Sequence, residues 1–395
     1  MIPIETGPPR PPGPPFVRDG FRPFFFGACA WAVFAMAEWL LVYATGGASP
    51  RAEILGMQWH AHGMIFGFSA AVIAGFLLTA VRNWTGRPTL SGRPLMVLFA
   101  AWLVARLLLS VKGAPVVLPA AADLLFSFGL LGAVLRPILA AGQMGKQAGI
   151  LSKVATLAVA NALFYAGMAG LLATGVRWGL YLGLYSVVGL VLAIGRRILP
   201  NFIAVGTGSS TPLKNDDRID RAALALFLVF LVAATFFEAS IVAAVSAGLL
   251  AIVHAVRLVG WHTPGIWKRP LLWAPYLSYG FLVAGFALMA LATVIPLPPF
   301  VGLHALAAGG VGLIAVGMMA RVSLGHTGRG IATLPPFTAT AFALVLAAAV
   351  VRVAFPIAAP SLVTIWIVMS QSLWVLGFAV LGVRFAPIWF GPPAR

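Results

Sequence analysis

The chain has 395 residues, of which 61% are hydrophobic and 9% are charged, and its formal net charge is +17. Soluble domains carry about 25% charged residues, so this composition excludes an ordinary soluble protein. The basic residues stand singly or in pairs between apolar runs, which is the topology signal of a membrane protein and argues against a nucleic-acid partner. The one cysteine, Cys29, excludes a disulfide framework and a cysteine-based metal site.

The chain begins with a Pro-rich cytoplasmic tail over residues 1–20, which we expect to be extended or disordered. Residues 21–395 are predicted to form a single, all-α transmembrane domain of about twelve helices. Apolar runs of about 20 residues are long enough to cross a bilayer as helices. The predicted helices lie near residues 24–45, 58–81, 94–112, 116–139, 150–174, 178–199, 221–240, 241–257, 271–295, 300–321, 336–357 and 361–385.

Two connections decide the count and the topology. The seventh and eighth runs share one apolar stretch, and only a tight turn around Glu238 to Ser240 would separate them. The longest loop, at about 200–220, is polar and is expected in the cytoplasm. With a cytoplasmic N-terminus, most of the 26 basic residues fall on the cytoplasmic side, as the positive-inside rule requires. An even number of spans then puts the C-terminus on that side as well.

Histidines and acids gather toward the predicted outer side. His60 and His62 begin the second helix there, and His304 begins the tenth. Ionisable groups inside a bilayer are costly and usually functional, so we expect a buried polar centre that carries protons from outside. The acids could instead be interfacial or paired with other polar groups. The candidate proton carriers are Glu38, Glu53, Asp123 and Glu238.

The spacing of the His-x-His pair limits its use as a metal site. Residues two apart on an α-helix point about 200° apart, so His60 and His62 cannot both bind one metal from one regular helix. They could serve two centres, or one could be a ligand and the other a supporting group. Both could also simply hydrogen-bond at the helix entrance.

The second and tenth helices are similar to each other. Both contain an outer histidine, small residues along the helix and a Thr-Gly-Arg at the inner end. When His62 is aligned with His304, the matching residues are Gly67 with Gly309, Gly75 with Gly317, Thr85 with Thr327, Gly86 with Gly328 and Arg87 with Arg329. The sequence therefore predicts an internal repeat.

Several segments resemble the NnrS family over essentially the whole chain. They are "FRPFFFGACAWA" (21–32), "WHAHGMIFGFSAAVIAGFLLTAVRNWTGRP" (59–88), "GRRILPNF" (195–202), "RPLLW" (269–273) and "HALAAGGVGLIAVGMMARVSLGHTGR" (304–329). The resemblance implies a bacterial inner-membrane protein with haem and copper, linked to nitric oxide and nitrosative stress in denitrifiers. By this resemblance, His60, His62, His304 and His326 match the family's histidines.

Three positions depart from the family pattern. Gly63 stands where the family usually has Glu, Tyr276 where it often has His, and Asn201 where an aromatic residue is usual. The first two departures would remove a proton carrier and a metal ligand, so the usual metal complement does not follow for this chain.

The arrangement also resembles the catalytic subunit of haem-copper oxidases and nitric oxide reductases, at the level of fold only. In that fold, haem lies between helices 2 and 10, and the twelve helices form three four-helix units. The sixth helix should then hold a third copy of the repeat, but it offers no histidine.

These observations predict a haem, of b type, between His62 and His304, with His60 facing a second centre of copper or another haem. The protein would bind or turn over nitric oxide or a related nitrogen oxide, and turnover would make it a nitric oxide reductase-like oxidoreductase. Its partners would be membrane lipid, the small ligand and an electron donor. Two alternatives are a twelve-helix transporter for a metal or nitrosylated iron species, and a haem-based sensor without turnover. His326 could join His262 in an inner-face copper site, although hydrogen bonding in loops is the commoner role.

Overall fold

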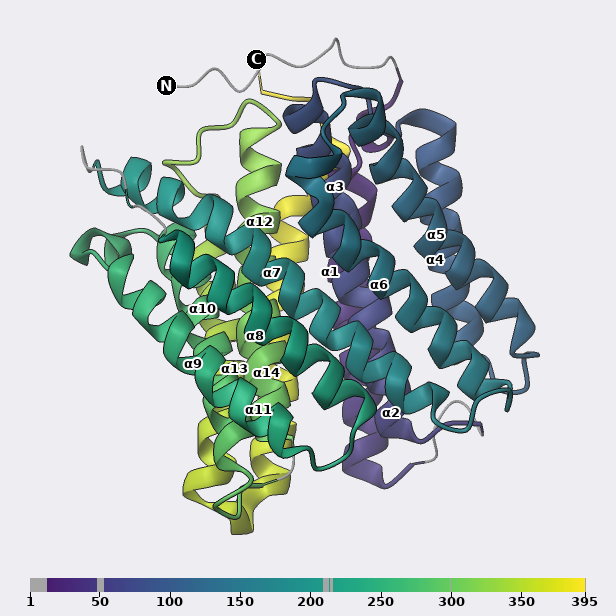
Figure 1. Cartoon of the computed structure of the whole chain (residues 1–395). Helices are drawn as coiled ribbons and strands as arrows, with labels where there is room; N and C mark the ends of the chain where they lie inside the picture. Colours follow the sequence, from purple (N-terminus) through teal and green to yellow (C-terminus); the bar gives the residue numbers. More distant parts are fainter. Residues whose placement is uncertain (1–12, 48–52, 209–212, 214–215, 299, 395) are drawn as a thin grey trace. The chain divides into compact units, whose positions relative to one another are not determined.

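The computed structural model describes residues 13–47, 53–208, 213, 216–298 and 300–394, and within these ranges it contains helices and no strands. Twelve of these helices are long and apolar enough to cross a membrane (Figure 1). The prediction of an all-helical polytopic membrane protein is therefore confirmed.

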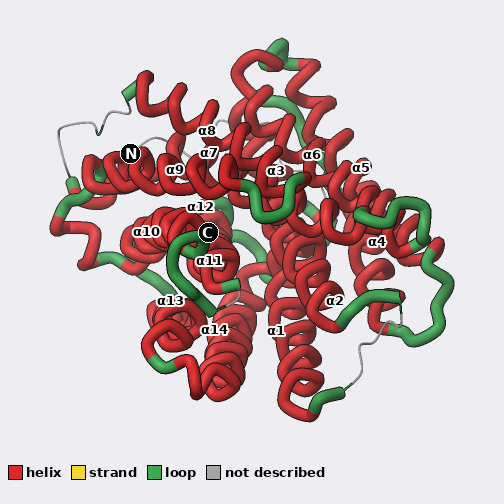
Figure 2. The backbone as a smooth tube through the Cα atoms, turned by 60° about the horizontal axis from the view of Figure 1, so that its bottom comes forward, coloured by secondary structure: helices red, strands yellow, loops and turns green. Residues whose placement is uncertain are grey.

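The spans follow the predicted order with shifts of a few residues at most ends. They are Phe21–Thr45 (α1), Gly56–Thr85 (α2, a π-helical segment and α3), Gly92–Ser110 (α4), Val117–Ala140 (α5), Met144–Met168 (α6), Gly175–Thr207 (α7), Asp217–Phe236 (α8), Ile241–Gly260 (α9), Pro270–Leu291 (α10), Val301–Gly325 (α11, a π-helical segment and α12), Thr338–Ala358 (α13) and Pro360–Phe390 (a short 3-10 helix and α14). Figure 2 shows the loops that join them.

The helix α7 runs beyond its predicted end. It continues through Pro200 to Thr207, so the polar connection begins at Gly208 rather than near residue 200. Pro200 removes one backbone hydrogen bond, but the residues after it still pack: Ile203 is buried and Gly206 lies against the Leu272 side chain. Residues 209–212 and 214–215 of the predicted loop lie outside the described residues.

A tight turn does separate α8 from α9. α8 ends at Phe236, α9 begins at Ile241, and Ala239 in between has a left-handed backbone with φ of 47°. The predicted pair of short helices is confirmed. Glu238 lies in this turn, where the sequence placed the break, and its side chain is exposed.

Side chains cap both helices at the connections around α8. The Asp216 carboxylate accepts hydrogen bonds from the backbone N–H groups of Arg218 (2.7 Å) and Ile219 (3.3 Å) at the start of α8. These bonds favour the charged form and hold the pKa of Asp216 below its usual value. The Ser240 hydroxyl accepts from Ala243 N–H at the start of α9 in the same way.

The chain forms two compact units. Unit 1 comprises Met1–Val187, Met318–Thr338 and Phe378–Arg395. Within it, α1 packs against α3, and α5 packs between α4 and α6. Unit 2 comprises Val188–Gly317 and Ala339–Gly377. Within it, α9 packs between α8 and α10, and α10 also contacts the segment that begins with α11.

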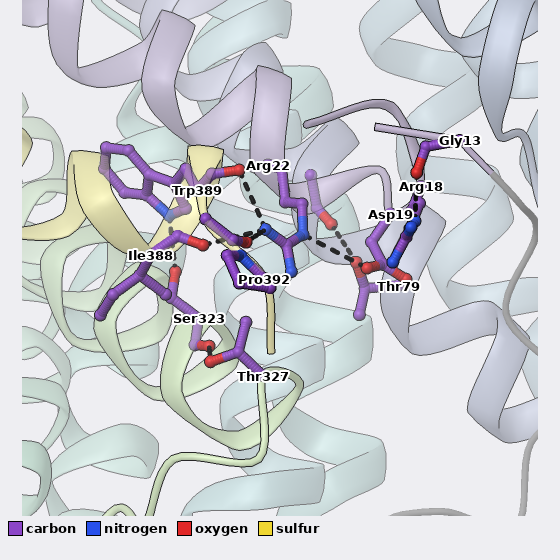
Figure 3. A network of polar contacts seen from close by, with 12 residues as sticks. Gly13, Arg18, Asp19, Arg22, Thr79, Ser323, Thr327, Ile388, Trp389 and Pro392 are labelled. Carbon is purple, nitrogen blue, oxygen red and sulfur yellow. Dashed lines mark hydrogen bonds and ion pairs between the residues drawn. The ribbon is translucent and has the colours of Figure 1, made fainter. Parts of the chain in front are cut away.

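The start of α1 and the end of α14 meet within unit 1 (Figure 3). Arg22, fully buried at the start of α1, donates from Nη1 to the carbonyls of Ile388 (2.9 Å), Trp389 (3.0 Å) and Gly391 (2.8 Å). An even number of spans requires the two ends of the membrane domain to lie on the same side of the membrane. The contacts of Arg22 with the end of α14 agree with this requirement.

Part of the Pro-rich segment is ordered. Pro15–Val17 forms a short 3-10 helix, and the Phe16 ring stacks on the Phe390 ring with centroids 4.5 Å apart. The expectation of an extended or disordered tail is therefore wrong for these residues, because the end of α14 supplies an apolar surface for Phe16. Residues 1–12 lie outside the described residues.

Candidate functional site

Two spans are interrupted by a π-helix at equivalent positions. The α-helix α2 (Gly56–His62) ends at His62 and is followed by a seven-residue π-helical segment, Gly63–Ser69. In the same way, α11 (Val301–His304) ends at His304 and is followed by the seven-residue π-helical segment Ala305–Val311. π-helical turns are rare in proteins, and those that do occur often lie at functional sites. The repeat predicted from sequence therefore extends to the backbone, and a histidine marks the start of each irregularity.

The inner ends of the two spans also match. Gly86 and Gly328 both have left-handed backbones, with φ of 65° and 73°. Thr85 and Thr327 each donate from the hydroxyl to the carbonyl four residues earlier, at 2.7 Å. Glycine tolerates the left-handed region, so Thr-Gly-Arg terminates the helix in both copies.

A glycine in each π-helical segment faces an aromatic ring of the preceding span. The Trp31 indole lies against Gly67, and the Phe281 ring lies against Gly309. A Cβ atom at either glycine would overlap the ring. The small residues thus permit close helix packing in both copies.

Side chains from neighbouring helices bind the carbonyls of these segments. In the first copy, Trp31 Nε1 donates to Gly63 O (2.8 Å) and Trp102 Nε1 donates to Gly67 O (3.0 Å). In the second copy, the Ser278 hydroxyl donates to Gly310 O (2.6 Å). Satisfying these carbonyls stabilises the irregular backbone in a membrane environment.

A third copy is not present in the sixth span. The helix α7 is α-helical throughout Gly175–Thr207 and contains no histidine. The arrangement in three four-helix units therefore stays a prediction. The second and tenth spans support it, and the sixth does not.

His62 lies in a buried polar cluster of unit 1. The residue is 1% exposed, and its ring stacks on Phe164, with centroids 4.1 Å apart. The Nε2 atom lies 3.0 Å from Asn161 Oδ1 and 3.5 Å from Asp123 Oδ2. Because Asn161 Nδ2 donates to the Ser127 hydroxyl (3.0 Å), its Oδ1 is left to accept from His62 Nε2–H.

Asp123 is the centre of this cluster. It forms an ion pair with Arg106, and both side chains are fully buried. The Tyr165 hydroxyl donates to Asp123 Oδ2 at 3.0 Å. We call His62, Arg106, Asp123, Asn161 and Tyr165 the His62 cluster; they come from α2, α4, α5 and α6.

The sequence pointed to part of the His62 cluster only. The expectation that Asp123 and His62 share a buried polar centre agrees with their contact. Arg106, Asn161 and Tyr165 were not among the candidate site residues. Arg106 could have been found from the sequence, because it is a charged residue inside an apolar run. Single Asn and Tyr residues in membrane helices are too common to be chosen as candidate site residues.

His60 lies on another face of α2. Its half-buried ring stacks on the Trp39 indole of α1, with centroids 5.2 Å apart and planes 15° apart. The two histidines therefore have different neighbours, as the helical spacing requires.

His304 is oriented by its own first helical turn. Its Nδ1 atom lies 2.9 Å from Phe300 O, and because a carbonyl can only accept, Nδ1 carries the proton. The neutral ring then has its lone pair on Nε2, which is the form that binds metals. Phe300 has a left-handed backbone with φ of 65°, a conformation that is strained for an aromatic residue.

The other predicted residues occupy separate places. His326 lies 3.5 Å from Asn83 Nδ2 in unit 1, and His262 accepts from Trp267 Nε1 (3.3 Å) in unit 2. Glu38 is half-buried on α1, and Glu53 is exposed before α2.

In the described ranges, no three His, Cys, Asp or Glu side chains gather to hold a metal ion. Haem iron needs only one or two imidazoles from the protein, and His304 already has the required tautomer. Tyr276, at the position where the sequence suggested a missing ligand, donates its hydroxyl to Leu258 O (3.1 Å).

Comparison with known proteins places the chain in a family. The model of the family described as NnrS protein matches residues 15–392, which include all twelve spans. A search of curated proteins found no match.

Proposed function

Because the chain belongs to the NnrS family, we propose that it is a haem-containing protein of the bacterial inner membrane that binds or turns over nitric oxide or a related nitrogen oxide. It would thereby protect the cell against nitrosative stress. The observation that carries this proposal is the pair of π-helical segments, each beginning directly after a candidate haem ligand.

His62 and His304 are the residues that would hold the haem. His304 fits this role because Phe300 fixes its proton on Nδ1 and leaves the lone pair on Nε2. His62 donates from Nε2 to Asn161, so its lone pair is on Nδ1. The bound haem would supply an iron centre for electron transfer or for binding nitric oxide.

A second centre would be needed for turnover. A haem with two histidine ligands has no open coordination position. We assign His60 to such a centre, either copper or another haem, because it faces Trp39 and not the His62 cluster. His326 is a further candidate metal ligand by family resemblance alone.

The His62 cluster is suited to protons and small polar molecules. Arg106 Nε and Nη1 and Asp123 Oδ1 are buried and make no hydrogen bond within the described residues. These atoms could bind water or a small polar ligand beside His62. We therefore propose Asp123 as a proton carrier, with Glu38, Glu53 and Glu238 closer to the predicted outer surface.

A transporter has less support from the repeat. A six-plus-six transporter would relate the second span to the eighth. The eighth span, Ile241–Gly260, is a regular α-helix, whereas the π-helical segment recurs in the tenth.

An optical spectrum of the detergent-purified protein from haem-replete cells tests the proposal. Oxidised and dithionite-reduced spectra would be recorded together with metal analysis for wild type, His62→Ala and His304→Ala. We expect a reduced α-band that both substitutions abolish. His262→Ala, at an exposed histidine, is the matched control and should keep the band.

Addition of nitric oxide to the purified protein then distinguishes turnover from sensing or binding. A spectral change with consumption of nitric oxide indicates turnover, and a change without consumption indicates a sensor or a binding protein. A colourless, metal-free wild type would overturn the haem proposal and make transport the leading function.

A further inference from the structure

The second and tenth spans lie beside each other at the ends that carry Thr-Gly-Arg. Asn83 Nδ2 of the second span lies 3.5 Å from His326 Nε2 at the end of the tenth. The Phe21 ring, at the start of α1, lies beside the His326 ring, with centroids 6.3 Å apart. All three residues belong to unit 1. The start of α1 is therefore the third element at the junction of the two repeat copies.

Arg22 joins this junction to the end of α14 (Figure 3). Its side chain is fully buried. Its Nη1 atom donates to the carbonyls of Ile388, Trp389 and Gly391. The last four carbonyls of an α-helix have no partner within the helix, and the helix dipole places partial negative charge there. Arg22 therefore supplies both the donors and the positive charge that stabilise the end of α14.

Asp19 connects Arg22 to the second span. Its Oδ2 atom lies 3.4 Å from Arg22 Nε, and its Oδ1 atom lies 3.7 Å from Arg82 Nη1. The Asp19 side chain is 13% exposed, so this contact lies largely out of water. A buried charge requires a counter-charge close to it. Asp19 supplies that counter-charge to both arginines and thereby holds the end of the second span near the start of α1.

Trp389 connects Arg22 to the tenth span. Its carbonyl accepts from Arg22 Nη1, and its indole Nε1 donates to the Ser323 hydroxyl at 2.8 Å. Trp389 and Ser323 are both fully buried. One residue of α14 thus binds Arg22 through its main chain and the tenth span through its side chain.

The segment after α14 follows the tenth span further. Ala394 N–H donates to Thr327 O at 2.8 Å, and Arg329 Nη2 donates to Pro392 O at 3.3 Å. Ser323 and Thr327 are four residues apart, which places them on one face of a helix. The end of α14 and the segment after it are therefore attached to the tenth span over about one helical turn.

We propose that Arg22 is the hub of a clasp that holds the second and tenth spans together at these ends. The clasp, which we call the Arg22 clasp, comprises Asp19, Arg22, Arg82, Ser323 and Trp389. Arg22 reaches the second span through Asp19 and the tenth span through Trp389. Because the two links share one buried residue, release of Arg22 would loosen both span ends together.

The clasp bears on how the protein moves. Transporters built from repeats work by moving one repeat or bundle against another. The Arg22 clasp ties two copies of a repeat together, so it restrains such a movement at this end. It therefore favours a protein with a fixed centre over one that opens alternately to two sides. The clasp contains none of the candidate metal ligands, so its test does not depend on bound haem.

Hydrogen–deuterium exchange of the full-length, detergent-purified protein, measured by mass spectrometry, tests the clasp. Peptides from residues 79–87 and 320–329 report on the two span ends. Peptides from α9 and α10 in unit 2 report on overall stability. Arg22→Met keeps a long side chain but removes its charge and its donors. We expect at least tenfold faster exchange at both span ends and unchanged exchange in α9 and α10.

Two further variants separate the links. Trp389→Phe keeps an aromatic ring but removes the donor to Ser323, so exchange should become faster at the end of the tenth span only. Asp19→Asn removes the counter-charge that Arg22 and Arg82 share, while Arg22 keeps its acceptors in α14. Exchange should then become faster at the end of the second span and stay unchanged in the tenth.

Arg18→Met is the matched control, because Arg18 lies in the same segment and donates from Nε to Gly13 O, outside the clasp. It should exchange as wild type does. Three results would overturn the proposal: Arg22→Met leaves both span ends unchanged, affects only one of them, or speeds exchange equally in α9 and α10. If Arg22→Met does not fold, Trp389→Phe and Asp19→Asn decide. Faster exchange at the matching span end in each supports the clasp, and any other pattern overturns it.

Discussion

The second and tenth spans share a backbone but hold their histidines differently. In both, a histidine ends a short α-helix and a seven-residue π-helical segment follows. His62 binds side chains of other helices, namely Asn161 and Asp123, whereas His304 binds the carbonyl of Phe300 in its own first turn. The repeat therefore determines the position of each histidine along its span. The groups packed around the histidine determine its hydrogen bonds.

The largest expected effect concerns the ion pair between Arg106 and Asp123 in the His62 cluster. Asp123→Ala would leave the Arg106 guanidinium fully buried without its counter-charge. We expect the free energy of unfolding to fall by about 3–5 kcal/mol. Denaturant titration of the detergent-purified protein would measure this change.

The double variant Arg106→Leu/Asp123→Leu is the control. It removes both charges and fills the space, so it should recover most of the loss. A single variant within about 1 kcal/mol of wild type would show that the pair is hydrated and that the His62 cluster is not dry.

An intermediate effect should be equal in the two copies. Gly67→Ala would drive a methyl group into the Trp31 indole, and Gly309→Ala would drive one into the Phe281 ring. We expect each substitution to lower the free energy of unfolding by about 1–3 kcal/mol, as overpacking does. Gly132→Ala on α5, where a Cβ meets nothing within 4 Å, should be neutral. If only one of the two glycine substitutions lowers the free energy of unfolding, the two π-helical segments are not equivalent.

The smallest effect distinguishes how the two copies begin. Phe300, before α11, has φ of 65°, whereas Leu55, before α2, has φ of −66°. Phe300→Gly should relieve backbone strain of about 1 kcal/mol, and Phe300→Val should increase it, because β-branched residues tolerate this region least. Thermal unfolding would rank the variants. Leu55→Gly is the matched control, and stabilisation by that substitution as well would remove strain as the explanation.

The sequence alone determined the membrane class, the number of spans and the equivalence of the second and tenth spans. Hydrophobic runs and glycine positions are local properties, and the free energy of burying about 20 apolar residues outweighs most tertiary preferences. The different directions of His60 and His62 also followed from local geometry, since helical rotation alone separates residues two apart.

Only the tertiary structure decided the site itself. The π-helical segments depend on glycines that admit Trp31 and Phe281 and on donors such as Ser278, which come from other spans. Arg106, Asn161 and Tyr165 reach His62 because α4, α5 and α6 pack in unit 1. Hydrophobic periodicity records which residues are apolar but not which helices become neighbours, so these partners could not be read from the chain.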